Sequence, residues 1–342
     1  MTTHTGAAAM TTQTSTYYAL ETMRTIRFGI ELEYVGITRE RAAQAIQSVI
    51  GGTVEHIGSP YVYDPFKIHG ANGQDWTIVR DGSVSDSRGN SCEVVSPPLG
   101  YDDISVLQDI VRALRRAGAR TNEKCGCHIH LDGGRFSIPE IVRLCKLTYQ
   151  QEELISEALE QVKARQRPSG LDGRCWCHPI PADFVRELDN VRTESQLKQA
   201  WYRTNGGYSE SNHYDNSRYH GLNLHSYFYR RNLGQSGTVE FRWFASTTHA
   251  GKVKSWIQFV LALGAKALNA RAASARRRVF NAAHTKYAFR VFTIRLGLNG
   301  SEFKTLRHHT LGQLRGSSSW ANGSQAASTR RRNGRNTEQP EA

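Results

Sequence analysis

The chain has 342 residues, and its hydrophobic content of 39% is sufficient for one large domain with tails or for two modest domains. Its formal net charge of +13 at pH 7 favours acidic partners such as nucleotides, nucleic acid or carboxylate-rich substrates. The sequence contains no run of about 18 apolar residues and begins without the pattern of a secretory signal, so we expect no membrane span and a cytoplasmic location.

Composition predicts three parts along the chain. Residues 1–24 are rich in Thr, Ala and Gln with little apolar patterning, and we expect a flexible N-terminal arm. Residues 25–300 contain the periodic apolar segments and form the expected folded domain. Residues 301–342 form a basic C-terminal tail that we expect to be disordered, because beyond Gly316 the chain is rich in Ser, Asn, Gly and Arg.

The first strongly patterned stretch is residues 28–34, in which apolar and acidic residues alternate. A β-strand points successive side chains to opposite faces, so Glu31 and Glu33 are expected on the face opposite the apolar residues. Two such carboxylates are often no more than a solvated strand face. The pattern gains weight because it returns three more times.

The later stretches place further ionisable residues on strand faces or at strand ends. They are Asp81 after a strand at 76–79, Glu93 in the following strand, His128 and His130 in residues 125–132, and Glu240 and Arg242 in residues 238–244. Apolar periodicity predicts helices between them at about 38–49, 102–117, 137–164, 182–188, 194–202 and 251–268.

If these strands join in one sheet, their ionisable side chains converge on one surface. Carboxylates that lie so close repel one another unless cations lie between them. Oxygen ligands with one or two imidazoles suit Mg²⁺ or Mn²⁺. The candidate metal ligands are Glu31, Glu33, Glu93, His130 and Glu240.

Residues 201–231 are unusually rich in Tyr, His and Arg. We expect a long loop here that covers the site and leads into a short strand at 221–224. Arg218, Arg230 and Arg231 are candidate contacts for an anionic ligand, although solvated arginines are the more common case. Asn223 either contacts a cofactor or satisfies a strand edge.

Two Cys-x-Cys-His units occur in the sequence. Their thiols, Cys125, Cys127, Cys175 and Cys177, are candidates for a structural zinc site, since thiolates favour this metal. The Cys-x-Cys spacing is less usual than Cys-x-x-Cys, and buried reduced thiols are the stronger interpretation.

An ordered series of short motifs resembles the amidoligases, which are distant relatives of glutamine synthetase and glutamate-cysteine ligase. The motifs are Gly29–Glu33, Asp81–Ser83, Glu93–Pro98, His128–His130, Gly221–Asn223 and Thr238–Arg242. The resemblance implies an α+β fold, an antiparallel sheet of the glutamine-synthetase type whose polar face is the active site, with helices on the other face. It also implies that residues 25–300 are the catalytic domain of a carboxylate–amine ligase.

The activity implied is ATP- and Mg²⁺-dependent formation of an amide or peptide-like bond through an acyl phosphate. The implied catalytic residues are Arg242, Glu240 and Asp81, and the implied ATP contacts are His128, His130, Asn223, Arg218 and Arg231. Asp81 is explained almost as well as an ordinary turn residue. The sequence contains no P-loop, so ATP binding depends on the resemblance.

Two other functions stay open. A metal-dependent hydrolase would use the same carboxylates and histidines without ATP. A nucleic-acid-binding protein would use the positive charge, including that of the C-terminal tail. For the ligase, the partners are a carboxylate substrate and an amine acceptor, which is an amino acid, a peptide or a protein side chain. The oligomeric state is open.

Overall fold

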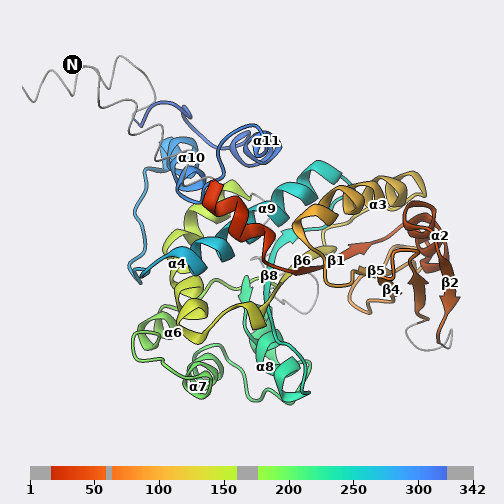
Figure 1. The fold of residues 1–342 in the computed structure, drawn as a ribbon, viewed down its shortest axis with the longest axis horizontal. Helices are drawn as coiled ribbons and strands as arrows, with labels where there is room; N and C mark the ends of the chain where they lie inside the picture. The colour runs from red at the N-terminus through yellow and green to blue at the C-terminus, as the bar shows by residue number, and fades with distance from the viewer. Residues whose placement is uncertain (1–16, 59–63, 160–175, 322–342) are drawn as a thin grey trace, which may run out of the picture.

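A computed structural model describes residues 17–58, 64–159 and 176–321 of the protein (Figure 1). Residues 1–16 of the expected N-terminal arm lie outside the described residues. Residues 17–24 are helical, and the side chain of Met23 is buried in the core. The folded structure therefore begins before the boundary expected at residue 25.

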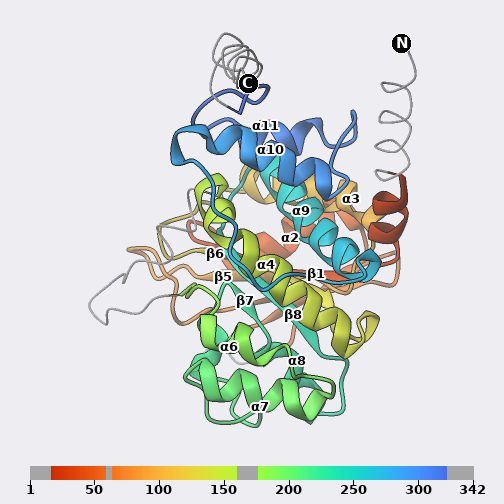
Figure 2. The same cartoon turned by 90° about the vertical axis from the view of Figure 1, so that its left-hand side faces the viewer.

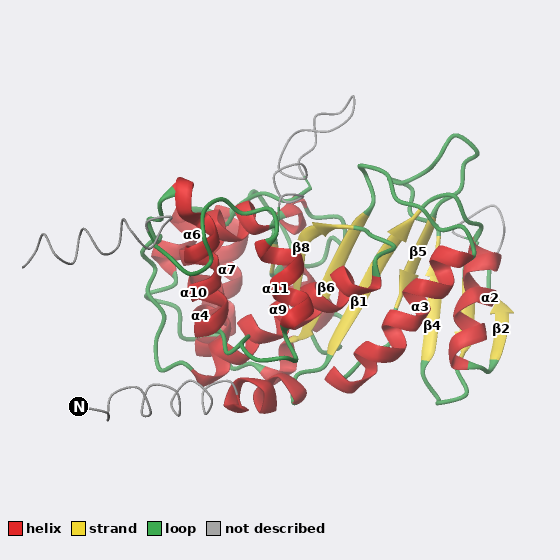
Figure 3. Ribbon diagram, turned by 90° about the horizontal axis from the view of Figure 1, so that it is seen from above, coloured by secondary structure: helices red, strands yellow, loops and turns green. Residues whose placement is uncertain are grey.

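Eight strands form one antiparallel sheet in the order β2-β3-β4-β5-β1-β6-β8-β7 (Figure 3). The strands are β1 (Phe28–Tyr34), β2 (Thr53–His56), β3 (Phe66–His69), β4 (Asp75–Val79), β5 (Cys92–Val95), β6 (Gly126–Asp132), β7 (Leu222–Asn223) and β8 (Thr238–Ala245). The helices are α2 (Arg39–Ile50), α3 (Ile104–Arg116), α4 (Ile138–Ala158), α6 (Ala182–Glu187), α7 (Glu194–Thr204), α8 (His225–Asn232), α9 (Ala250–Asn269), α10 (Thr285–Arg295) and α11 (Lys304–Leu311).

Because side chains alternate along each strand, the apolar ones lie on one face of the sheet, and helices cover that face. Ile30, Leu32 and Tyr34 of β1 are buried in the core, and α2, α3 and α9 lie over this face (Figure 3). Phe244 of β8 stacks on Trp256 of α9 with 5.0 Å between ring centroids. The prediction of an α+β fold with an antiparallel sheet is confirmed. The acidic residues of β1 lie on the opposite face.

The expected loop at 201–231 is only partly correct. Its first residues complete α7, and its last residues form α8, which follows directly after β7. The sequence His225–Asn232 lacks a regular apolar repeat, so helical periodicity does not reveal α8. Only His225, Tyr227 and Phe228 of this helix are buried.

The C-terminal boundary expected at residue 300 falls within the folded structure. Helix α11 packs against α9 and α10, and its residue Leu306 is fully buried together with Phe303 just before it. Residues 322–342 lie outside the described residues. Across the described parts of the chain, no helix is long and apolar enough to cross a membrane.

Gly221 allows β7 to lie against a buried tryptophan. A Cβ atom at this position would lie 2.2 Å from Nε1 of Trp243 and 3.1 Å from Sγ of Cys177. We expect Gly221→Ala to lower the free energy of unfolding by about 1–3 kcal/mol, because the added methyl group overpacks the core. Urea denaturation followed by circular dichroism measures this change.

Gly82→Ala is the matched control, because a Cβ atom there meets no atom within 4 Å. We expect its unfolding free energy to stay within about 0.5 kcal/mol of the wild-type value. Equal stability of both variants would contradict the close packing at Gly221.

Candidate active site

The polar face of the sheet brings the predicted carboxylates and histidines together. Strand register places them opposite one another on neighbouring strands, where Cβ atoms are about 5 Å apart. The opposed pairs are Glu31 with His128, Glu33 with Glu93, His130 with Glu240, and Asn223 with Glu240. Residues from β1, β5, β6, β7 and β8 therefore form one continuous polar surface at the middle of the sheet.

Glu31 lies at the centre of this surface. Its Oε2 lies 3.1 Å from Nδ1 of His128, and its Oε1 lies 3.2 Å from Nε2 of His130. Burial alone would raise the pKa of Glu31, but the charge of His130 and the hydrogen bonds from both histidines hold that pKa well below its usual range. Glu31 is therefore an anion at neutral pH.

Glu240 is fixed by contacts to both of its oxygens. Oε2 accepts hydrogen bonds from Nδ2 of Asn223 at 2.6 Å and from Oγ of Ser226 at 2.7 Å. Oε1 accepts a hydrogen bond from the Arg242 guanidinium. Burial would raise the pKa of Glu240, but the charges of Arg242 and His130 lower it to about 2.

Three donors of this surface suit a cation. One ligand atom each from Glu31, His130 and Glu240 lies within 4.8 Å of the others. Nδ1 of His130 lies 3.2 Å from Oγ1 of Thr238, whereas its buried Nε2 lies 3.2 Å from Oε1 of Glu31. A buried imidazole nitrogen held beside two carboxylates fits a divalent cation such as Mg²⁺ or Mn²⁺. Within the described residues, Glu31, His130 and Glu240 form the group whose potential ligand atoms lie close enough together to hold an ion.

A second acidic pair adjoins this group. Glu33 accepts a hydrogen bond from the backbone N–H of Gly126, and its Oε1 lies 3.7 Å from Nε2 of His128. Glu93 stands opposite Glu33 in the register. Burial, followed by the charges of Glu31, Glu33 and Asp81, raises the pKa of Glu93 well above its usual range. A cation between Glu33 and Glu93 would relieve this repulsion.

The comparison with known protein families agrees with this geometry. A family model described as "Putative amidoligase enzyme" matches residues 24–264, which include every strand and every predicted site residue. The chain belongs to this amidoligase family. A search of curated proteins found no match. Membership of the family identifies the protein as a ligase-type enzyme.

Arg242 is the cation of this amidoligase surface. Its Nη1 donates to Glu240 and lies 3.5 Å from Nδ1 of His128, and its Nε is buried without a hydrogen bond. Burial would lower the pKa of Arg242, but Glu240, Glu33 and Glu31 raise it. The guanidinium is therefore permanently charged, and its Nε donor is unused.

Asp81 lies at the edge of the amidoligase site. Its Oδ1 accepts hydrogen bonds from the backbone N–H of Ser83 at 2.7 Å and from Oγ of the same residue at 2.8 Å. This is the local pattern of an Asx turn. Asp81 nevertheless lies close enough to Glu93 for its charge to raise the Glu93 pKa. The structure thus supports the turn and places the carboxylate beside the acidic pair.

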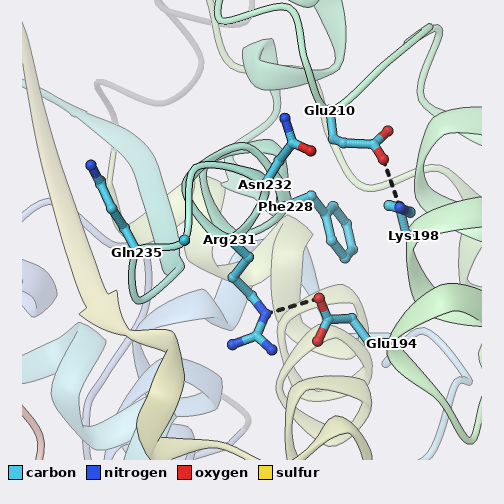
Figure 4. A pocket seen from close by; sticks show the side chains of 8 residues that line it. Glu194, Lys198, Glu210, Phe228, Arg231, Asn232 and Gln235 are labelled. Atoms are coloured by element: carbon cyan, nitrogen blue, oxygen red, sulfur yellow. Dashed lines mark hydrogen bonds and ion pairs between the residues drawn. The ribbon is translucent and has the colours of Figure 1, made fainter.

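Two of the predicted arginine contacts, Arg218 and Arg231, are placed differently. The guanidinium of Arg218 stacks on Tyr214 at 4.9 Å and on Tyr219 at 4.8 Å from the ring centroids. Arg231 donates from Nε to Glu194 of α7 at 2.8 Å and lines a separate cavity of about 410 Å³ between α7 and α8 (Figure 4). Lys198 and Glu210 form a second ion pair in that cavity, at 2.6 Å.

His213 and Ser226 border the amidoligase site but are not among the predicted site residues, whereas Arg230 is one of the predicted anion contacts. Burial and the charges of Arg218 and Arg230 lower the pKa of His213, and the charges of Glu31 and Glu240 offset only part of this lowering. The charge of Arg230 also acts on His130. The ring of His213 stacks on Tyr229 with 4.9 Å between centroids. The sequence signal for His213 was the general Tyr/His/Arg enrichment of 201–231.

The cysteines of the zinc hypothesis stay untested as a metal site. Cys125, Cys127 and Cys177 are buried. Cys127 faces the apolar core rather than the polar surface that holds His128. Cys175 lies outside the described residues, so structural zinc remains a prediction.

Proposed function

We propose that this protein is an ATP-dependent carboxylate–amine ligase that forms an amide or peptide-like bond through an acyl phosphate. The observation that carries the proposal is the group of Glu31, His130 and Glu240, whose ligand atoms lie within 4.8 Å of one another beside Arg242. Family membership supports the ligase class. We also propose that the sheet is of the glutamine-synthetase type, with its polar face as the active site.

In the proposed reaction, an oxygen of the substrate carboxylate attacks the γ-phosphorus of ATP and ADP leaves. The amine nitrogen then attacks the acyl carbon, inorganic phosphate leaves, and the nitrogen loses a proton. Both steps need negative charge to be neutralised around the phosphates more than they need a protein nucleophile. Mg²⁺ or Mn²⁺ held by the carboxylates would supply this neutralisation.

The residues of the polar face have distinct proposed roles. Glu31, His130 and Glu240 would hold one cation, and Glu33 with Glu93 would hold a second. Arg242 would donate two hydrogen bonds to oxygens of the transferring phosphoryl group. Its contact with Glu240 fixes the guanidinium on this face. Asn223 would act by positioning Glu240.

The segment around His213 would form the nucleotide side of the site. His213 interacts electrostatically with Glu31 and Glu240, and Arg230 interacts with His130 and His213. The charges of Arg218 and Arg230 suit the phosphates of ATP, and the stacked His213 and Tyr229 rings suit its base. Arg231, which pairs with Glu194 in another cavity, is excluded from this proposed role. Asp81 would contact the substrate amine or a cation beside Glu93.

The raised pKa of Glu93 predicts a pH dependence of metal binding. Because the pKa of Glu93 is raised, a proton on this carboxyl group competes with a bound cation. We expect Mn²⁺ affinity to rise as pH increases through the raised pKa of Glu93, and to rise less in Glu93→Gln. Isothermal titration calorimetry in two buffers of different ionisation enthalpy measures the proton released.

The same shift acts on stability with the opposite sign. A carboxyl group whose pKa is raised in the folded state contributes stability that is lost as pH rises through that raised pKa, so the metal-free protein should become less stable as Glu93 loses its proton. Mn²⁺ affinity that is independent of pH in the wild-type protein would contradict the assignment of Glu93 to the metal site.

The experiment that tests the proposed function measures ADP and phosphate release with Mg²⁺ and a pooled set of amino acids and polyamines. We expect turnover that requires the pool and that is lost in the Glu31→Gln/Glu33→Gln variant. Splitting the pool then identifies the acid and the amine. Amide or phosphoester hydrolysis without ATP would instead support a metal-dependent hydrolase, and a folded protein without ATP turnover would contradict the ligase.

A further inference from the structure

Most of the net positive charge of this protein follows the part that matches the family. Residues 265–316 contain eleven Lys and Arg residues but one acidic residue, Glu302, and so carry a net charge of +10, compared with +13 for the whole chain. They include the end of α9 and all of α10 and α11. These helices lie at the end of the molecule opposite α7 and α8 (Figures 1 and 2). We call residues 265–316 the basic layer.

Several cations of the basic layer lie near one another without acidic partners. Burial and the charge of Arg295 lower the pKa of Arg278, and burial and the charge of Arg290 lower the pKa of Arg307. Within the described residues, none of these four arginines forms an ion pair with a carboxylate. In contrast, Arg277 pairs with Glu152 at 3.4 Å. The layer therefore presents uncompensated positive charge.

A cavity of about 300 Å³ opens on this layer between residues 17–24, the end of α9 and α10. Its lining residues are Tyr18, Ala19, Thr22, Ala265, Lys266, Asn269, Arg295 and Leu296. Two cations and an aromatic ring thus meet in a cavity that no acidic side chain lines. Tyr18 is 62% exposed, and its neighbour Tyr17 is 61% exposed with 5.9 Å between the two ring centroids.

We propose that the basic layer binds single-stranded nucleic acid, with a base stacked on Tyr18 and neighbouring phosphates contacted by Lys266 and Arg295. Exposed tyrosines beside cations are the combination that single strands recognise, because unpaired bases offer their faces for stacking. A duplex hides those faces, and an acidic peptide would use the cations and leave the tyrosines without a role.

The basic layer is separated from the ligase site. Helices α10 and α11 pack on α4 and α9, and α9 covers the apolar face of the sheet, whereas the carboxylates lie on the polar face. Nucleic acid bound at the layer does not need to enter the site of ligation. The surface would therefore hold the enzyme on a nucleic acid while the polar face stays open.

Fluorescence anisotropy with the full chain and a labelled oligonucleotide of about 20 nucleotides tests this proposal. We expect Lys266→Gln/Arg295→Gln to weaken binding about tenfold and to reduce the slope of log affinity against log salt by about 1 to 2. Tyr18→Leu should weaken binding about fivefold or more, because one stacking contact is lost.

Arg186→Gln/Arg203→Gln is the matched control. It removes the same charge from α6 and α7 at the other end of the molecule, where these side chains are 72% and 61% exposed. We expect binding within about twofold of the wild type. Thermal melts establish that each variant is folded.

Three results would overturn the proposal. One is an equal loss of affinity in Lys266→Gln/Arg295→Gln and in the control Arg186→Gln/Arg203→Gln. Another is tighter or equal binding of a blunt duplex of the same sequence. The third is equally strong competition by poly-glutamate at matched charge, which would assign the layer to an acidic protein.

Discussion

Replacing Arg242 by lysine is expected to lower kcat for ATP-dependent ligation by about 10³-fold, the scale at which arginine stabilises phosphoryl transfer. Lysine keeps the positive charge but loses the planar pair of donors that engages two phosphate oxygens. The KM for ATP should change much less, because the lost interaction forms mainly in the transition state. Steady-state kinetics and a thermal melt of the variant measure both effects.

Arg231→Lys provides the matched comparison. Arg231 pairs with Glu194 in a cavity between α7 and α8, away from the polar face. We expect its kcat to stay within about threefold of the wild type. If Arg231→Lys lost more activity than Arg242→Lys, the phosphate contact would have to be reassigned.

Replacing Glu31 by glutamine is expected to lower kcat by about 10²–10³-fold with Mg²⁺, because a neutral amide is a far poorer ligand for a hard cation. Glu31 contacts both His128 and His130, so its loss also releases the two imidazoles. Higher Mg²⁺ concentration should restore part of the activity, which steady-state assays over a Mg²⁺ series detect.

Glu55→Gln is the control for this variant. Glu55 lies on β2 at the edge of the same sheet and its side chain is 59% exposed, where it contacts His69. We expect wild-type activity and wild-type Mg²⁺ dependence. A Glu31→Gln variant that behaves in the same way as Glu55→Gln would remove Glu31 from the metal site.

The site could be predicted from the sequence largely because a β-strand has a period of two. The spacing of Glu31 and Glu33, and that of Glu240 and Arg242, fixed which side chains share a face before any partner strand was known. The family resemblance then put these strands in one sheet. The direct pairing of Glu33 with Glu93 could not be predicted, because strand register depends on contacts between distant segments.

A β-bulge explains where the alternation of side chains fails along β8. The register between β6 and β8 shifts between Cys127 and Ile129, which pair with Phe244 and Phe241. This bulge ends the simple alternation of β8, so that Trp243 and Phe244 are both buried. Strict alternation of side chains along β8 would place one of these two residues on the polar face.

Helix α8 explains why the sequence could not separate two adjacent arginines that were both candidate anion contacts. Arg230 and Arg231 are neighbours in sequence, but successive helical residues point about 100° apart. Arg230 acts on His130, whereas Arg231 turns toward Glu194. Without a predicted helix, the two could not be distinguished. The folded α11 was missed for a related reason, since its burial depends on contact with α9.

Mn²⁺ titration of the purified protein, followed by electron paramagnetic resonance of free Mn²⁺, tests the metal site on the polar face. We expect saturable binding that Mg²⁺ displaces, that Glu55→Gln retains and that Glu31→Gln weakens about 10–100-fold. A folded wild-type protein that binds no Mn²⁺, with or without ATP, would contradict a metal-dependent ligase site on the polar face.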